Sequence, residues 1–339
     1  MFQRILVPLD GSLRAERALP VAARLAHAAH GTVVLLRVVA MPVDYVAYMM
    51  PPVASIEDVI DTDLSEAASY LNHVAQSPIL KDISVEKKAI FGAVADTILS
   101  VAESSDIDLV IICSHGYTGL TRWALGSVAE KVVHHAPMPV LLLHEGGPVP
   151  GAPHLDAVRP LCVLVPLDGS VLAKAAIEPA AELISALAAP AQAKLHFTRV
   201  VQTTPTEAQG VKHEESEYRL HNARKYLETA VGHVREGLVA PIVAKLQLAT
   251  SWSVAIENDV AGAIIRVAEN GEDVKGVGVP GGCDVIALAT HGRSGFQRWA
   301  LGSVTERVLH ATKLPVLIVR PAEKAAGGAD SKHAAAAVQ

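Results

Sequence analysis

The segment SHGYTGLTRWALGSVAEKVVHHAPMPVLLL at residues 114–143 returns as THGRSGFQRWALGSVTERVLHATKLPVLIV at residues 290–319. Sixteen of the thirty aligned positions are identical. A second match lies upstream of each segment, where Leu6–Ser12 and Leu164–Ser170 both read LVPLDGS. Two separate matches that occur in the same order predict a duplicated domain and not a chance motif.

The length and the spacing of the matches predict two domains of ordinary size. A chain of 339 residues gives each repeat enough material to bury its own core. A Gly/Pro-rich stretch without periodicity separates the repeats, and an Ala/Gly/Lys-rich tail predicted to be disordered follows them. The predicted parts are domain one at 1–144, a linker at 145–157, domain two at 158–321 and the tail at 322–339.

The composition excludes several classes of protein. Half of the residues are apolar, aromatic residues make up 4%, and the net charge is −6 without any cluster of Lys and Arg, which argues against a nucleic-acid partner. No signal peptide precedes the first predicted strand and no apolar run reaches membrane-spanning length, so no membrane partner is expected. Three cysteines in or beside apolar runs favour a reduced, cytoplasmic protein without a disulfide framework.

Repeat one alternates short apolar runs with segments of helical periodicity. Continuous apolar strands separated by helices are typical of a parallel sheet that is covered on both faces. The predicted fold is therefore doubly wound α/β, with ligands expected at the carboxyl ends of the strands. The expected strands are 5–8, 32–39, 84–90, 109–113 and 140–143, and the expected helices are 14–29, 55–76, 93–104 and 128–135.

Repeat two is longer than repeat one between the two matches. The offset between the repeats grows from 158 residues at Asp10 and Asp168 to 176 residues at His115 and His291. Much of the extra length lies at 269–282, a polar and glycine-rich stretch that predicts a surface loop before the fourth strand.

Glycines that could approach an anion recur in both repeats. Gly116 follows the fourth predicted strand, and Gly126 with Ser127 precedes the last predicted helix. Glycine lets the backbone come close to a phosphate, and a helix N-terminus offers unpaired N–H groups. The alternative is that Ser127 and Glu130 form an S-x-x-E capping box that closes the helix. Both interpretations stay open, although the same spacing in repeat two favours the phosphate.

Polar residues of the first turn have two interpretations as well. Asp10 and Asp168 can accept hydrogen bonds from a ribose or help to hold a metal, or they can cap the helix that follows. His115 and His291 stand beside the loop glycines, where a hydrogen bond that shapes the loop is favoured over a catalytic role. The sequence contains no P-loop, no Gly-x-Gly-x-x-Gly after the first strand, no Gly-x-Ser-x-Gly elbow and no histidines at metal-ligand spacing.

Taken together, VPLDGS at the first turn, HGxxG after the fourth strand and LGSVxExV before the closing PV resemble a tandem universal stress protein. The resemblance covers nearly all of 1–321. It implies five-stranded parallel sheets of order 3-2-1-4-5. It also implies pairing through the last strand, as an intrachain pseudo-dimer of the two repeats or as a homodimer.

The resemblance further implies a binding site for ATP, with or without Mg²⁺. Members of the ATP-binding branch hold the adenosine at the first turn and the phosphates at the later glycines. In repeat one these residues are Pro8, Leu9, Asp10, Val38, Gly116, Gly126, Ser127 and Val128. In repeat two they are Pro166, Leu167, Asp168, Val200, Ala289, His291, Gly292, Gly302, Ser303 and Val304.

One position departs from the pattern of that branch. Its first glycine is replaced by Cys113 in repeat one and by Ala289 in repeat two, where a Cβ can crowd the phosphate. Because alanine is the smaller of the two, we expect repeat two to bind nucleotide more tightly than repeat one.

The sequence therefore predicts a nucleotide-binding sensor or regulator of a stress response and not a dedicated enzyme. Any ATP hydrolysis is expected to be slow, since no Walker lysine and no group that would orient a water is evident. One alternative is a protein-interaction scaffold of the same family that binds no nucleotide. Another is an adenylyl transferase, for which further basic or histidine signatures are lacking.

Overall fold

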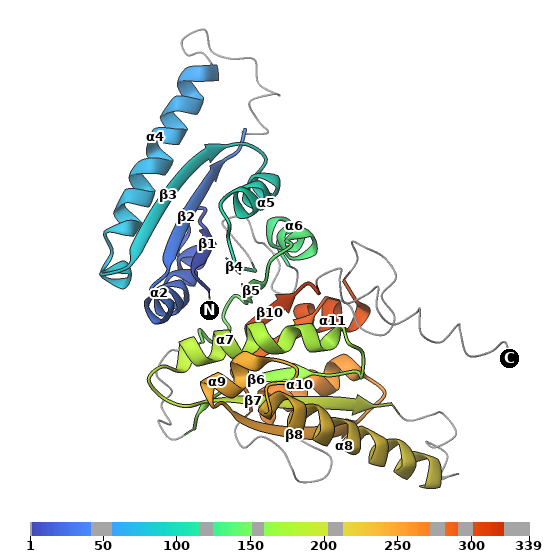
Figure 1. Cartoon of the computed structure of the whole chain (residues 1–339). Coiled ribbons are helices and arrows are strands. Elements are labelled where there is room, and N and C mark those ends of the chain that lie inside the picture. Colours follow the sequence, from blue (N-terminus) through green and yellow to red (C-terminus); the bar gives the residue numbers. More distant parts are fainter. Residues whose placement is uncertain are drawn as a thin grey trace, which may run out of the picture. The chain divides into compact units, whose positions relative to one another are not determined.

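The computed structural model shows two compact units, each built on a parallel β-sheet (Figure 1). The structure describes residues 2–41, 56–114, 125–150, 159–202, 213–271, 282–290 and 301–321.

The first unit is a five-stranded sheet of order β3-β2-β1-β4-β5, which confirms the predicted strand order. Helices α2 and α4 lie on one face of this sheet and α5 and α6 on the other (Figure 1). The elements are β1 (Arg4–Pro8), α1 (Leu13–Glu16), α2 (Ala18–Ala29), β2 (Thr32–Val39), α4 (Ile56–Ala75), η1 (Pro78–Leu80), β3 (Ser84–Phe91), α5 (Val94–Ser104), β4 (Leu109–Cys113), α6 (Ser127–His135) and β5 (Val140–Leu143).

The second unit repeats this order, as β8-β7-β6-β9-β10. Its last strand lies beside β9, where the Thr290 N–H donates to the Val319 carbonyl at 2.9 Å. The elements are β6 (Leu161–Pro166), η2 (Ala173–Ala176), α7 (Ile177–Ala188), β7 (Ala193–Val201), α8 (His213–Arg235), α9 (Pro241–Leu246), β8 (Ala249–Ile256), α10 (Val260–Asn270), β9 (Val285–Ala289), α11 (Ser303–Ala311) and β10 (Val316–Val319).

The central strands form the core of each unit. Ile5, Leu6 and Val7 of β1 have no measurable exposure, and Leu109 and Val110 of β4 are equally buried. Burial on both faces explains why these strands are continuous apolar runs. The outer strand β3 is partly exposed and carries charged residues instead.

One predicted helix is broken in the structure. The expected helix 14–29 is divided into α1 and α2 at Arg17. Pro20 lacks an N–H group, so the carbonyl of Glu16 loses its partner four residues ahead and the helical hydrogen-bond ladder is interrupted there. Most of the loop expected at 269–282 lies outside the described residues. Its first two positions are helical instead, because α10 continues to Asn270 and Gly271 ends it in a left-handed conformation with φ of 70°.

The strand order places a cleft in each unit where β1 and β4, or β6 and β9, lie side by side. The chain leaves these two strands toward opposite faces of the sheet, which opens a crevice at their carboxyl ends. Among the described residues, no helix has both the length and the apolar character required to cross a membrane.

Candidate nucleotide-binding site

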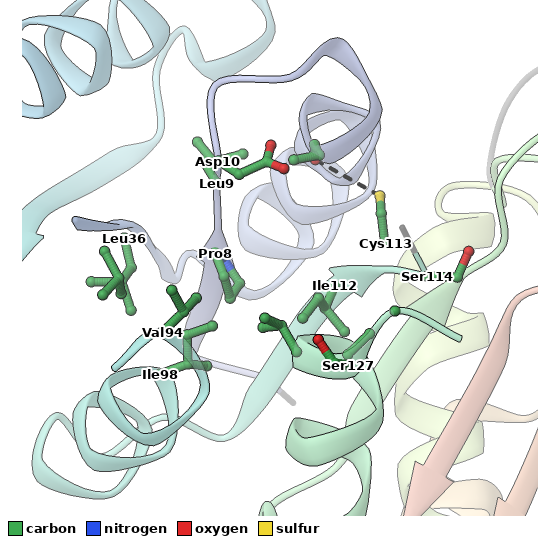
Figure 2. Close-up of a pocket in the computed structure, with 15 residues that line it drawn as sticks. Pro8, Leu9, Asp10, Leu36, Val94, Ile98, Ile112, Cys113, Ser114 and Ser127 are labelled. Carbon is green, nitrogen blue, oxygen red and sulfur yellow. Dashed lines mark hydrogen bonds between the residues drawn. The ribbon is translucent and has the colours of Figure 1, made fainter. Parts of the chain in front are cut away.

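The first unit has a cavity of about 280 Å³ at the carboxyl ends of β1, β2 and β4 (Figure 2). Leu36, Val94 and Ile98 gather at one end of it, and Cys113 and Ser114 lie at the other. The cavity therefore has an apolar end and a more polar end, as a ligand with a flat apolar part and a charged tail requires.

Most of the residues predicted for the first site line this cavity. The structure brings the residues of the first turn and of the last helix together around one cavity, although they are more than a hundred positions apart. Gly116 lies outside the described residues. The predicted residues that line the first cavity are Pro8, Leu9, Asp10, Val38, Gly126, Ser127 and Val128.

The second unit has the corresponding cavity, of about 190 Å³, at the carboxyl ends of β6, β7 and β9. Again the first turn and the last helix meet, whereas His291 and Gly292 lie outside the described residues. The predicted residues that line the second cavity are Pro166, Leu167, Asp168, Val200, Ala289, Gly302, Ser303 and Val304.

Asp10 shapes the first turn and does not cap the helix, so the capping alternative for this residue is wrong. Its Oδ1 accepts from the N–H of Ser12 at 2.9 Å and from the Ser12 hydroxyl at 2.6 Å. Ser12 is the actual N-cap, since its Oγ accepts from the Ala15 N–H. In the second unit Asp168 accepts from the Ser170 N–H at 2.8 Å in the same way. Both aspartates are thereby held at the wall of their cavity.

The capping box proposed for the last helix does not form. The N-cap of α6 is Gly126, which has no side chain to cap with, and Ser127 is the first helical residue. Gly302 occupies the same place before α11. The N–H groups of the first helical turn have no partner within the helix. Because Ser127 and Val128, like Ser303 and Val304, line the cavities, the positive end of each helix dipole borders its cavity.

Gly126 and Gly302 also form backbone hydrogen bonds to the residue that follows β4 or β9. The Gly126 N–H donates to the Ser114 carbonyl, and the Gly302 N–H donates to the Thr290 carbonyl, both at 2.8 Å. A Cβ built on Gly302 would lie 3.3 Å from that carbonyl oxygen. Glycine at this position therefore allows the helix start to approach the strand end closely.

Cys113 narrows the first cavity without closing it. Its Sγ lies 3.8 Å from the Ala15 carbonyl oxygen, on the side of the cavity formed by α1. Burial raises the pKa of the Cys113 thiol to about 11, against the opposing charge of Arg17, so this thiol is neutral at physiological pH. The cavity beside Cys113 is larger than the one beside Ala289. Which repeat binds nucleotide more tightly stays a prediction.

The helix that borders the apolar end of each cavity was not predicted as part of the site. Val94 and Ile98 of α5 line the first cavity, and Val260 and Ile264 of α10 line the second. Both pairs have i, i+4 spacing, which indicates one helix face. Apolar residues at this spacing also occur on helices that pack against a sheet along their whole length. The local sequence therefore does not distinguish such a helix from one that borders a cavity.

The floor of the second cavity differs from that of the first in polarity. Leu36 lines the first cavity, and Thr198 takes its place in the second. The Ser253 hydroxyl donates to Thr198 Oγ1 at 3.3 Å, and His196 Nε2 is hydrogen-bonded to the same Ser253 Oγ at 2.8 Å. His196 Nδ1 is bonded to Ser251 Oγ at 2.8 Å. A buried polar ladder therefore runs between β7 and β8.

An arginine supports the first turn of each unit from outside the cavity. The Arg37 guanidinium lies 4.9 Å from the centre of the Tyr70 ring, and a Cβ on Gly11, whose φ is +87°, would come within 2.5 Å of Arg37 Nη1. The Tyr70 hydroxyl donates to Glu16 Oε1 at 2.8 Å. Burial, followed by this hydrogen bond, raises the pKa of Tyr70. The turn is thus packed against a cation–π pair.

The second unit has the same arginine–tyrosine contact, but a basic residue replaces the acidic one beside the tyrosine. Arg199 lies 4.7 Å from the centre of the Tyr226 ring. Lys174 stands 5.9 Å from the same ring, and it occupies the position that Glu16 has in the first unit. The tyrosine that packs on the arginine thus has an acidic neighbour in the first unit and a basic one in the second.

Neither cavity is lined by a lysine or arginine among the described residues. An anion bound there would be held by backbone amides and hydroxyls and not by a cationic side chain. The described part of the chain also holds no group of three or more His, Cys, Asp or Glu that could bind a metal ion.

The family model described as the universal stress protein family matches residues 1–144 and 162–320. The chain belongs to the universal stress protein family. It is a tandem member, because the same model matches both repeats. The resemblance that the sequence motifs indicated is thereby confirmed.

Individual universal stress proteins are distant in sequence. One from Mycolicibacterium smegmatis is 24% identical over 325 residues, which cover 94% of this chain and 97% of that protein. Universal stress protein A homolog 1 of Coxiella burnetii is 28% identical over 142 residues, which are 41% of this chain and 94% of the relative. A crystal structure of a universal stress protein from Archaeoglobus fulgidus has a TM-score of 0.62 at 19% identity, covers 94% of this chain and 98% of its own, and shows the shared fold.

Proposed function

We propose that both units bind an adenine nucleotide, with ATP as the leading ligand, and that the protein acts as a sensor or regulator. The observation that carries this proposal is the meeting of an apolar slot and an uncapped helix N-terminus in one cavity, in both units. The resemblance to the ATP-binding branch of the family supports the choice of nucleotide.

In the proposed complex the base enters between Val38 and the α5 residues Val94 and Ile98. The ribose lies against Asp10. The phosphates reach the amides at Ser127 and Val128. Cavities of 280 and 190 Å³ lie below the usual range of about 300 to 1,000 Å³ for ligand pockets, so the phosphate tail would extend out of the cavity over the helix start.

Binding is proposed to signal and not to drive rapid catalysis. Among the described lining residues the ionisable groups are Asp10 and Cys113 in the first unit and Asp168 in the second, so a cation that could stabilise phosphoryl transfer is lacking there. Mg²⁺, when bound, would supply that charge through the nucleotide. A cytoplasmic location, an intrachain pseudo-dimer and a further homodimer stay predictions of the sequence.

Equilibrium dialysis with labelled ATP tests the proposal on the full chain. We expect saturable uptake at two sites. Val128→Trp and Val304→Trp each fill one cavity with an indole, so each is expected to remove one site, and the double variant both. Leu238→Trp, at a position with 68% exposure on the second unit, is the matched control and is expected to retain both sites.

Two results would contradict this function. Absence of saturable uptake by the unmodified chain would favour the scaffold alternative. Uptake that survives in the double variant would show that the nucleotide binds elsewhere. Mass spectrometry of small molecules released on denaturation would then identify which nucleotide accompanies the purified protein.

A further inference from the structure

Two buried thiols meet in the second unit. Cys162 Sγ and Cys283 Sγ lie 3.0 Å apart, and the two residues are 1% and 4% exposed. They are separated by 121 positions in the chain. Cys162 is in β6, and Cys283 stands just before β9. Both are free cysteines, so the fold holds a reduced pair of thiols in contact.

The backbone around this pair is fixed by hydrogen bonds. The Asp284 carboxylate accepts from the Cys162 N–H at 2.7 Å, and the Asp284 N–H donates to the Cys162 carbonyl at 2.7 Å. The Cys283 N–H donates to the Ala268 carbonyl at 2.6 Å. These bonds hold the backbones of Cys162 and Cys283 in place beside each other.

The first unit has the same backbone arrangement without the thiols. Asp108 accepts from the Arg4 N–H, with Oδ1 and Oδ2 both at 3.2 Å, and its own N–H donates to the Arg4 carbonyl at 3.1 Å. The residues at the two cysteine positions are Arg4 and Ile107. Both units therefore share the aspartate that hydrogen-bonds the backbone of the neighbouring strand. Only the second unit has two cysteines at this place.

We propose that Cys162 and Cys283 form an oxidation-sensitive dithiol that hydrogen peroxide converts to a disulfide across β6 and β9. One sulfur attacks the O–O bond and becomes a sulfenic acid, and the other peroxide oxygen leaves as water. The second thiol then displaces the sulfenic oxygen as another water. The two sulfurs lose two electrons and two protons in total, and hydrogen peroxide is reduced to two molecules of water.

The geometry requires little rearrangement. A disulfide has an S–S distance of about 2.05 Å, so sulfurs at 3.0 Å must approach by about 1 Å. The hydrogen bond with Cys162, together with burial, raises the pKa of Cys283, which keeps this thiol protonated and slows its reaction. We therefore expect the oxidation to be slow.

The cross-link would tie together the strands that carry the second cavity. β6 leads to Leu167 and Asp168, and β9 ends at Ala289, all of which line that cavity. A disulfide that closes a loop of this length restricts the unfolded chain strongly, so the oxidised second unit is expected to resist unfolding.

The test uses the full chain with Cys113→Ser, which leaves only this pair. The reduced protein is treated with hydrogen peroxide, quenched, denatured, alkylated with N-ethylmaleimide and weighed by mass spectrometry. We expect the loss of two hydrogens without alkylation, a tryptic cross-link between the Cys162 and Cys283 peptides, and reversal by dithiothreitol. The thermal midpoint is expected to rise by roughly 10 °C.

Single-cysteine variants supply the control. Cys162→Ala and Cys283→Ala in the same background are expected to gain oxygen atoms or dimerise, without an internal cross-link. The unmodified chain, with its third thiol, is expected to retain one alkylatable cysteine after oxidation. The proposal is overturned if the oxidised pair remains fully alkylatable, carries added oxygen on each sulfur or links only between chains.

Discussion

Replacing Gly282 with alanine is expected to lower the free energy of unfolding of the second unit by about 3 to 4 kcal/mol. Gly282 has a φ of +74°, a left-handed conformation that disfavours any side chain. A Cβ at this position would lie 2.6 Å from the Ala268 carbonyl oxygen and 2.7 Å from that of Glu269. These are backbone atoms at the end of α10, so they cannot rotate away as a flexible side chain does.

Gly146→Ala is the matched control for this prediction. Gly146 has nearly the same conformation, with φ of +70°, but a Cβ there meets nothing within 4 Å. We expect Gly146→Ala to lower the free energy of unfolding by about 1 to 2 kcal/mol, which is the cost of the left-handed conformation alone. Urea denaturation followed by circular dichroism measures both variants. Equal losses would show that the contact with α10 adds nothing to the conformational penalty.

Acid is expected to destabilise the second unit through His196. This residue is 1% exposed and bonded through both ring nitrogens to Ser251 and Ser253. Burial, followed by the charge of Lys194, lowers the pKa of His196 to about 3. As the pH falls below about 6.5, the His196 side chain becomes protonated in the unfolded chain but stays neutral in the folded chain. The free energy of unfolding therefore decreases by about 1.4 kcal/mol per pH unit.

The effect accumulates to roughly 3 kcal/mol between pH 6.5 and pH 4. His196→Gln keeps a donor and an acceptor for the two serines but does not titrate in this range. Its stability, measured by urea denaturation at several pH values, is expected to be less steeply pH-dependent than that of the unmodified chain. Comparing the two chains cancels the contribution of the carboxylates. Parallel curves would mean that His196 accepts its proton in the folded state.

Much of the fold could be predicted because its signals are local or repeated. Apolar runs located β2, β4 and β5 within a residue of their bounds, since burial on both faces leaves a continuous pattern. The helix break at Arg17 was missed, although Pro20 was visible, because helical periodicity continues through it. The capping box was wrong because Gly126, and not Ser127, takes the capping position.

The candidate site divides in the same way. The first turn and the last helix were predicted from motifs that each lie within a few residues of chain. Thr198 in the second cavity was not predicted. Its hydrogen bond with Ser253 depends on the register between β7 and β8, which places the two residues opposite each other. Ile98 was missed because a helix face that borders a cavity has the same spacing as one that packs against a sheet.

The sequence by itself determined the duplication, the alternation of strands and helices, and the turns that can approach an anion, because each depends on residues that are close together in the chain. Only the tertiary structure decided which side chains meet across strands. The contact between Cys162 and Cys283 and the burial of His196 depend on the pairing of distant strands, and no local pattern of residues encodes the distance between them.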